Sequence, residues 1–150
     1  MIRIQQEDFN VEEEVAALRS QSGSVGAIVT FTGLVRDFSD DSDIHTLFLE
    51  HYPGMTEKSL TNIVGEAIER WQLIGVRVIH RVGRLKPKDQ IVLVAVSSGH
   101  RQDAFAASEF IMDYLKTRAP FWKKEETDSG SRWLDARSSD LDASAKWERD

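Results

Sequence analysis

The sequence predicts an α+β fold: a single domain over residues 1–150 in which helices pack against a mixed, mainly antiparallel sheet. Segments with the apolar pattern of strands follow one another directly along the chain and also alternate with segments of helical period. A length of 150 residues is the usual size of one domain, and 41% hydrophobic with 29% charged residues is typical of a globular protein. These observations favour one α+β unit.

A capping pattern and an alternating pattern predict the first elements. Asn10, followed three residues later by Glu13, is typical of a helix N-terminus, and the apolar spacing behind it predicts a helix to about Arg19. The segment 25–35 is rich in β-branched residues and alternates in polarity, which predicts a strand with Arg36 at its exit.

The same two periodicities predict the remaining elements. Strands are expected over 46–50, 76–82, 91–97, 121–126 and 132–135, and helices over 60–71 and 100–117. The strand 91–97 is apolar on both faces and should be central in the sheet. Pro120 must end the second helix, because proline pushes the preceding residue out of helical geometry.

Two segments are compositionally biased, the acidic loop 37–43 and the tail 138–150, and we expect both to be mobile. The aspartates of the loop do not form a calcium loop, because the glycine and the distal glutamate of that motif are lacking. His45, His51 and His80 have no second ligand at metal-binding spacing, so we interpret them as hydrogen-bonded structural positions. We expect neither a metal site nor a cofactor.

Composition excludes several classes of protein. The chain has no cysteine, which excludes disulfides, zinc–thiolate sites and thiol nucleophiles. A net charge of -6 argues against a general nucleic-acid binder. No apolar run approaches the ~20 residues of a membrane span, and the start MIRIQQEDFN lacks the basic flank and apolar core of an export signal. We expect a cytoplasmic protein that binds neither membranes nor nucleic acid.

Basic residues at the ends of predicted elements mark candidate sites. The segment 97–101 places His100 and Arg101 at a helix start, where free backbone N–H groups attract anions, so it is either a phosphate site or a solvated helix end. Lys116 and Lys123 flank the turn forced by proline. A desolvated lysine can act as a base or nucleophile, whereas most lysines at element ends are only solvated.

Five segments carry a specific resemblance. They are FTGLVRD at 31–37, LEHYPGMTEK at 49–58, IHRVGRLKPKD at 79–89, SSGHR at 97–101 and FIMDYLKTRAPFWKKE at 110–125. Together they resemble the large, catalytic subunit of molybdopterin synthase, the MoaE family. The likeness covers about residues 25–137, and its last segment is long and highly specific.

The resemblance implies an α/β-hammerhead-like fold and a sulfurtransferase activity in molybdenum cofactor biosynthesis. Cyclic pyranopterin monophosphate would be converted into molybdopterin by installation of the dithiolene sulfurs. The implied sulfur donor is a small ubiquitin-like partner subunit with a C-terminal glycine thiocarboxylate, in a heterotetramer built on a homodimer of the large subunit. A chain without cysteine fits this scheme, because the sulfur arrives on the partner.

The resemblance also implies roles for individual residues, some of them contributed across the dimer. The matching positions are Lys116 and Lys123 for catalysis, and Arg36, His100, Arg101 and Arg137 for substrate binding. In the mechanism we expect, the substrate-binding cations fix the phosphorylated pterin while Lys116 assists attack of the thiocarboxylate sulfur. Lys123 would supply charge near the partner's terminal carboxylate.

The chain departs from the family pattern at a few positions. Lys88 stands where many members have glycine in a turn, Gly99 replaces a commoner alanine, and the loop 37–43 is unusually acidic. We expect the Lys88 difference to concern the turn and not the site. Two other readings stay open: a non-catalytic module that only docks a ubiquitin-like tail, and a general phosphate-ligand or nucleotide-binding domain.

Overall fold

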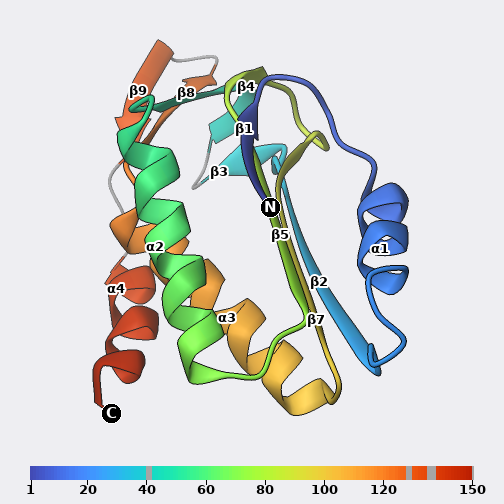
Figure 1. The fold of residues 1–150 in the computed structure, drawn as a ribbon. Coiled ribbons are helices and arrows are strands. Elements are labelled where there is room, and N and C mark those ends of the chain that lie inside the picture. The colour runs from blue at the N-terminus through green and yellow to red at the C-terminus, as the bar shows by residue number, and fades with distance from the viewer. Residues whose placement is uncertain (40–41, 128–129, 135–137, 150) are drawn as a thin grey trace.

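The computed structural model describes residues 1–39, 42–127, 130–134 and 138–149 and confirms the α+β class (Figure 1). In chain order the elements are β1 (Ile2–Gln5), α1 (Val11–Arg19), β2 (Ala27–Leu34), β3 (Phe38–Ser39), β4 (Ser42–His51), α2 (Met55–Arg70), β5 (Gly75–Arg81), β6 (Gly83–Leu85), β7 (Gln90–Ser98), α3 (Arg101–Arg118), β8 (Phe121–Thr127), β9 (Gly130–Leu134), α4 (Ser138–Ala145) and a 3-10 turn (Lys146–Arg149). The short strands β1, β3 and β6 and the helix α4 were not predicted.

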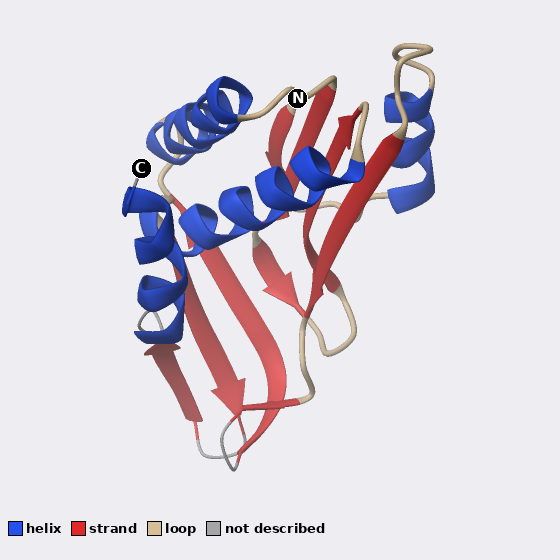
Figure 2. Ribbon diagram, turned by 90° about the horizontal axis from the view of Figure 1, so that it is seen from below, coloured by secondary structure: helices blue, strands red, loops and turns tan. Residues whose placement is uncertain are grey.

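The strands divide between two sheets, a feature that the sequence alone did not predict. The first sheet has the order β1-β5-β7-β2, with β1 parallel to β5 and the other pairs antiparallel. The second is antiparallel, with the order β3-β4-β8-β9 and β6 paired to β4. Figure 2 shows the sheets as two groups of strands, with α3 lying across the first. The predicted central position of β7 is confirmed.

The first sheet is covered on both faces, which explains why β7 is apolar from Ile91 to Val96. Its residues Val92, Val94 and Val96 belong to the core that α2 and α3 close, whereas Leu93 and Ala95 pack in the core beneath α1. Successive strand residues point to opposite faces, so a strand between two helical layers needs apolar side chains at every position. Figure 1 shows α1 on one side of this sheet and the other helices on the opposite side.

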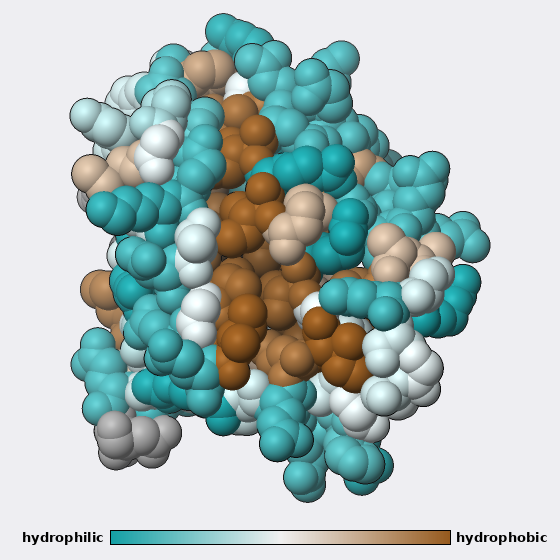
Figure 3. Space-filling model, viewed as in Figure 1, coloured by the Kyte–Doolittle hydropathy of each residue, from teal (hydrophilic) through white to brown (hydrophobic). Residues whose placement is uncertain are grey.

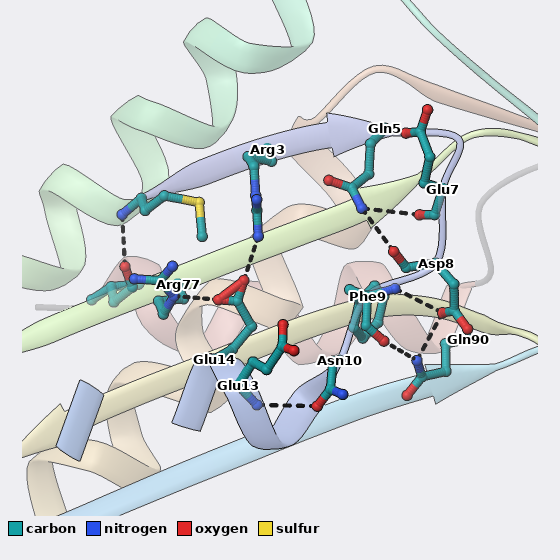
Figure 4. Close-up of polar contacts among 12 residues, drawn as sticks. Arg3, Gln5, Glu7, Asp8, Phe9, Asn10, Glu13, Glu14, Arg77 and Gln90 are labelled. Carbon is teal, nitrogen blue, oxygen red and sulfur yellow. Dashed lines mark hydrogen bonds and ion pairs between the residues drawn. The ribbon is translucent and has the colours of Figure 1, made fainter. Parts of the chain in front are cut away.

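The helix α1 is capped and anchored as its sequence predicts. The Asn10 side chain accepts a hydrogen bond from the Glu13 backbone N–H at 3.1 Å, which satisfies a free donor of the first turn. Glu14, only 6% exposed, accepts hydrogen bonds from Arg3 of β1 and, at 2.7 Å, from Nε of Arg77 of β5 (Figure 4). Two guanidinium groups thus compensate the buried carboxylate and tie α1 to the sheet.

The helix α2 begins at Met55, five residues earlier than predicted. Gly54 has φ 87°, a conformation that glycine adopts without steric cost, and its N–H donates to the Glu57 carboxylate at 2.9 Å. The glycine turn therefore starts the helix at Met55, whereas the apolar pattern that predicted the helix begins only at residue 60. None of the described helices is long and apolar enough to span a membrane.

Residues 138–149 are structured where a mobile tail was expected. Helix α4 packs beside α3, and the ring of Trp147 meets the rings of Trp71 and Phe110 edge-on at 5.6 and 5.4 Å. The Trp147 indole N–H also donates to Asp113 at 2.7 Å. The tail is ordered because an aromatic residue near its end completes the main core.

The segment 37–43 also contains more structure than expected. Phe38 pairs with Asp43 and Ser39 with Ser42, so β3 and the start of β4 form a short hairpin. Residues 40 and 41, between these strands, lie outside the described residues.

Candidate active site

A cavity of about 560 Å³ lies between α3, the strands β2, β7 and β8, and the start of α4. Arg36, Lys116 and Lys123 all line this cavity, so the structure brings together three of the predicted site residues. Apolar side chains from both sheets form much of the remaining wall. The described apolar lining includes Phe31, Leu34, Val35, Leu47, Ile91, Val92, Met112, Leu115, Phe121 and Leu134.

Arg36 is positioned by the turn that contains Lys88. The backbone of its neighbour Val35 accepts from the Lys88 N–H at 2.7 Å and donates to the Asp89 carbonyl at 2.9 Å. Lys88 has φ 78°, and within the described chain it is the only non-glycine residue with positive φ. With Pro87 before it, this is the geometry of a type II turn, which favours glycine at the Lys88 position. As expected, Lys88 lies in a turn and is not among the residues that line the cavity. The backbone of this turn holds the strand exit next to Arg36.

The turn between α3 and β8 brings the two lysines to the same cavity. As predicted, α3 ends before Pro120, and Ala119 is extended with φ -84° and ψ 128°. The buried Thr56 hydroxyl donates to the Pro120 carbonyl at 3.0 Å and accepts from the Tyr52 N–H at 2.9 Å. The start of α2 therefore fixes this turn. Lys116 is exposed at the end of α3, and Lys123 is half-buried on β8.

Two carboxylates also line the cavity. Glu125 is 3% exposed, and its carboxylate lies 3.3 Å from the Arg132 guanidinium of β9. This contact compensates much of its charge. Asp140 is contributed by α4, so the segment expected to be a mobile tail forms part of the wall. With Arg36 and the two lysines present, cationic side chains outnumber carboxylates among the described lining residues.

His80 lines the same cavity, a role that sequence analysis did not assign to it. Its ring is 3% exposed and stacks on Phe121 with ring centroids 3.8 Å apart and an angle of 17°. Nδ1 lies 2.8 Å from the Arg81 carbonyl oxygen. Burial disfavours the charged ring, and the nearby Lys123 and Lys116 add to this effect, so the pKa of His80 falls to about 3.

The sequence held a signal for His80 that could have been used. Val76, Val78 and His80 alternate along β5 and therefore share the face that α2 and α3 cover. A histidine in register with buried valines must be buried itself, and such a position calls for a specific partner or role.

The other predicted anion site lies at the far end of α3. His100 and Arg101 are exposed at its N-terminus, and 15 helical steps of about 1.5 Å put Arg101 about 22 Å along the helix from Lys116. Within one chain these residues therefore do not share the cavity. Their contribution from a neighbouring protomer stays a prediction. Arg137 lies outside the described residues.

The serines that precede His100 have structural contacts. Ser97 and Ser98 are buried, and their hydroxyls donate to the backbone carbonyls of Gly75 and Gln72 at 3.4 and 2.7 Å. An anion at this helix start would be held by His100, Arg101 and the free backbone N–H groups, without the serine hydroxyls.

A second cavity of about 590 Å³ lies between α1, α2 and β5. Figure 3 shows an apolar band on this face of the molecule, flanked by hydrophilic surface. Met1, Val64, Ile68 and Leu73 are among the residues that line this second cavity, and none of the predicted site residues that the structure describes is.

Residues 4–118 match the family model of the MoaE protein. The chain belongs to the MoaE protein family. Among MoaE relatives, the molybdopterin synthase catalytic subunit of Ralstonia nicotianae is 60% identical over 146 residues, which are 97% of this chain and 83% of the relative. The molybdopterin synthase catalytic subunit of Vibrio cholerae is 59% identical over 147 residues, 98% of this chain and 97% of the relative.

The MoaE fold is confirmed by a solved structure. The molybdopterin biosynthesis MoaE protein from Burkholderia ambifaria superposes with a TM-score of 0.85 at 55% identity, covering 100% of this chain and 99% of that chain. The MoaE family match contains Arg36 and Lys116 and ends before Lys123, but the similarity to the Ralstonia and Vibrio relatives spans nearly all of this chain.

Proposed function

We propose that this chain is the catalytic subunit of a molybdopterin synthase and acts as a sulfurtransferase. It converts cyclic pyranopterin monophosphate into molybdopterin, with sulfur from the thiocarboxylated C-terminus of a small ubiquitin-like partner. The observation that carries this proposal is the convergence of Arg36, Lys116 and Lys123 on one cavity. Family membership and 60% identity to a molybdopterin synthase catalytic subunit support it.

The chemistry of the cavity suits an anionic ring and a carboxylate-bearing tail. A volume of about 560 Å³ lies within the usual range for small-molecule sites. Fixed cations at an apolar wall stabilise negative charge without the reorganisation that water requires. In this proposal Arg36 binds the substrate anion, Lys116 assists attack of the thiocarboxylate sulfur, and Lys123 orients the partner's terminal carboxylate.

The remaining predicted residues are assigned to a dimer. His100 and Arg101 lie about 22 Å from Lys116 along α3, too far to bind the same phosphate within one chain. We propose that each protomer of a homodimer contributes them to the cavity of its partner, with one small subunit bound to each catalytic subunit. The cytoplasmic location stays a prediction.

The deciding experiment mixes the purified chain with a thiocarboxylated partner and cyclic pyranopterin monophosphate and detects molybdopterin by mass. Lys116→Ala should lower turnover by about 10² to 10⁴-fold, because an acid–base or electrostatic group is lost. Partner binding should stay unchanged. Lys124→Ala is the matched control: Lys124 lies over the rings of Phe48 and Trp133, and it is not among the cavity-lining residues. Normal turnover in the Lys116 variant would remove that residue from the mechanism.

The rival readings predict different binding. A docking module would bind the partner's tail but show no saturable affinity for cyclic pyranopterin monophosphate. A general phosphate-binding domain would take up simple phosphates equally well and would not need the lysine pair. Calorimetric titration of the chain with cyclic pyranopterin monophosphate, and separately with inorganic phosphate, distinguishes these cases.

A further inference from the structure

We propose that His80 is a substrate-binding residue of this cavity, whose Nε2 accepts a hydrogen bond from an N–H or O–H group of the bound pterin. This inference rests on the proposed function and extends it to a residue outside the predicted set. It follows from the tautomer of the ring, from the position of its free nitrogen and from the other groups that line the cavity.

The tautomer is determined by the contact with the backbone. Nδ1 lies 2.8 Å from the Arg81 carbonyl oxygen, and a carbonyl oxygen can only accept, so Nδ1 carries the proton. Burial keeps the ring neutral, and the neighbouring lysines favour the same state. A neutral imidazole protonated at Nδ1 presents a lone pair at Nε2, which makes that nitrogen an acceptor.

The position of Nε2 follows from burial. Only 3% of the residue is exposed, its ring is held against Phe121, and it lines the cavity beside Lys116 and Lys123. In the part of the chain that the structure describes, the contact of Nδ1 with Arg81 is the only hydrogen bond of the His80 ring. Nε2 therefore has no protein partner there, and it is not fully enclosed by protein atoms. The ring is therefore a fixed, nearly buried acceptor that faces the cavity, and a ligand donor would satisfy it.

His80 adds a neutral acceptor to a cavity whose described lining otherwise carries three cations and two carboxylates, Glu125 and Asp140. Arg36, Lys116 and Lys123 can only donate, so they suit the phosphate of the substrate and the partner's carboxylate. A pterin ring, by contrast, carries several N–H donors. Glu125 is engaged by Arg132 at 3.3 Å. A neutral imidazole accepts a hydrogen bond without cancelling the positive charge of the lysines, which another free carboxylate would do.

Two substitutions separate the acceptor from the structural contact. In His80→Asn the amide nitrogen can take the place of Nδ1 and still donate to the Arg81 carbonyl, but the side chain ends short of Nε2. In His80→Gln the longer side chain can present its oxygen where Nε2 lies. We expect His80→Asn to raise the KM for cyclic pyranopterin monophosphate by about tenfold, as for one lost hydrogen bond, with kcat within about threefold of wild type. His80→Gln should stay within about threefold of the wild-type KM.

The KM for the thiocarboxylated partner and the thermal midpoint of each variant are measured alongside. Wild-type KM for the pterin in His80→Asn would overturn the inference and leave the proposed function intact. A fall in kcat together with equal rises in the KM for the pterin and the KM for the partner would also overturn the inference, because this result indicates a purely structural role. If His80→Asn does not fold, His80→Gln decides: a tenfold rise in its pterin KM at an unchanged midpoint contradicts the acceptor role. A wild-type chain that forms no molybdopterin refutes the proposed function and this inference together.

Discussion

Replacing Thr56 by valine should loosen the turn that places both site lysines. The Thr56 side chain is fully buried, and its hydroxyl joins the Tyr52 N–H to the Pro120 carbonyl at 2.9 and 3.0 Å. Valine fills nearly the same volume, so the change removes these hydrogen bonds without opening a cavity. Each buried polar group that loses its hydrogen-bond partner costs about 1–3 kcal/mol. Because Tyr52 and Pro120 are partly exposed to water, we expect the free energy of unfolding to fall by about 2–3 kcal/mol in total.

Urea denaturation at pH 7 measures this loss directly, and the midpoint of thermal unfolding should fall by about 4–12 °C for a domain of this size. Thr56→Ser is the matched control, because it keeps the hydroxyl and removes one methyl group, at a cost of about 1 kcal/mol. Turnover at 25 °C should fall more in the valine variant than in the serine variant, since the turn joins Lys116 to Lys123. A valine variant as stable as the serine variant would refute the assigned role of the hydroxyl.

Three further predictions concern stability. Lys88→Gly should raise the free energy of unfolding by about 0.5–1 kcal/mol, because it relieves a positive φ at the cost of some backbone entropy, whereas Lys88→Ala should bring no gain. The pKa of His80 is about 3 in the folded chain against 6.5 for an ordinary histidine, so as pH falls below 6.5 the unfolded state takes up the proton first and stability decreases. Wild type should therefore lose about 2 kcal/mol more between pH 7 and pH 5 than His80→Asn, and equal losses in urea titrations would contradict the buried neutral ring. Trp147→Ala should destabilise the chain by about 2–3 kcal/mol through lost packing on Phe110 and the lost bond to Asp113, and an unchanged midpoint would show that the tail contributes nothing to the core.

The local elements were predictable because their causes lie within a few residues. The cap of Asn10 on Glu13 and the helix end before Pro120 both follow from contacts between near neighbours in the sequence. The central position of β7 followed from apolar residues on both of its faces. The start of α2 was missed because a glycine turn, and not the apolar period, determines it.

The candidate site was predictable in part. The motif around Lys116 and Lys123 and the strand exit at Arg36 identified three residues that share one cavity. His80 was missed because sequence analysis considered metal ligation and not burial. The spatial relation of His100 and Arg101 to this cavity was not predictable either, because it depends on the length and direction of α3.

By itself the sequence determined the type and order of most elements, the family and the cationic character of the site, because periodicity, caps and motifs act over short separations along the chain. Only the tertiary structure decided the division into two sheets, the ordering of residues 138–149 and the place of His80 in the cavity wall. These features depend on packing between segments far apart in the chain, such as β4 against β8 or Trp147 against Phe110. No local pattern encodes the partner of a strand or which distant segments meet at a cavity.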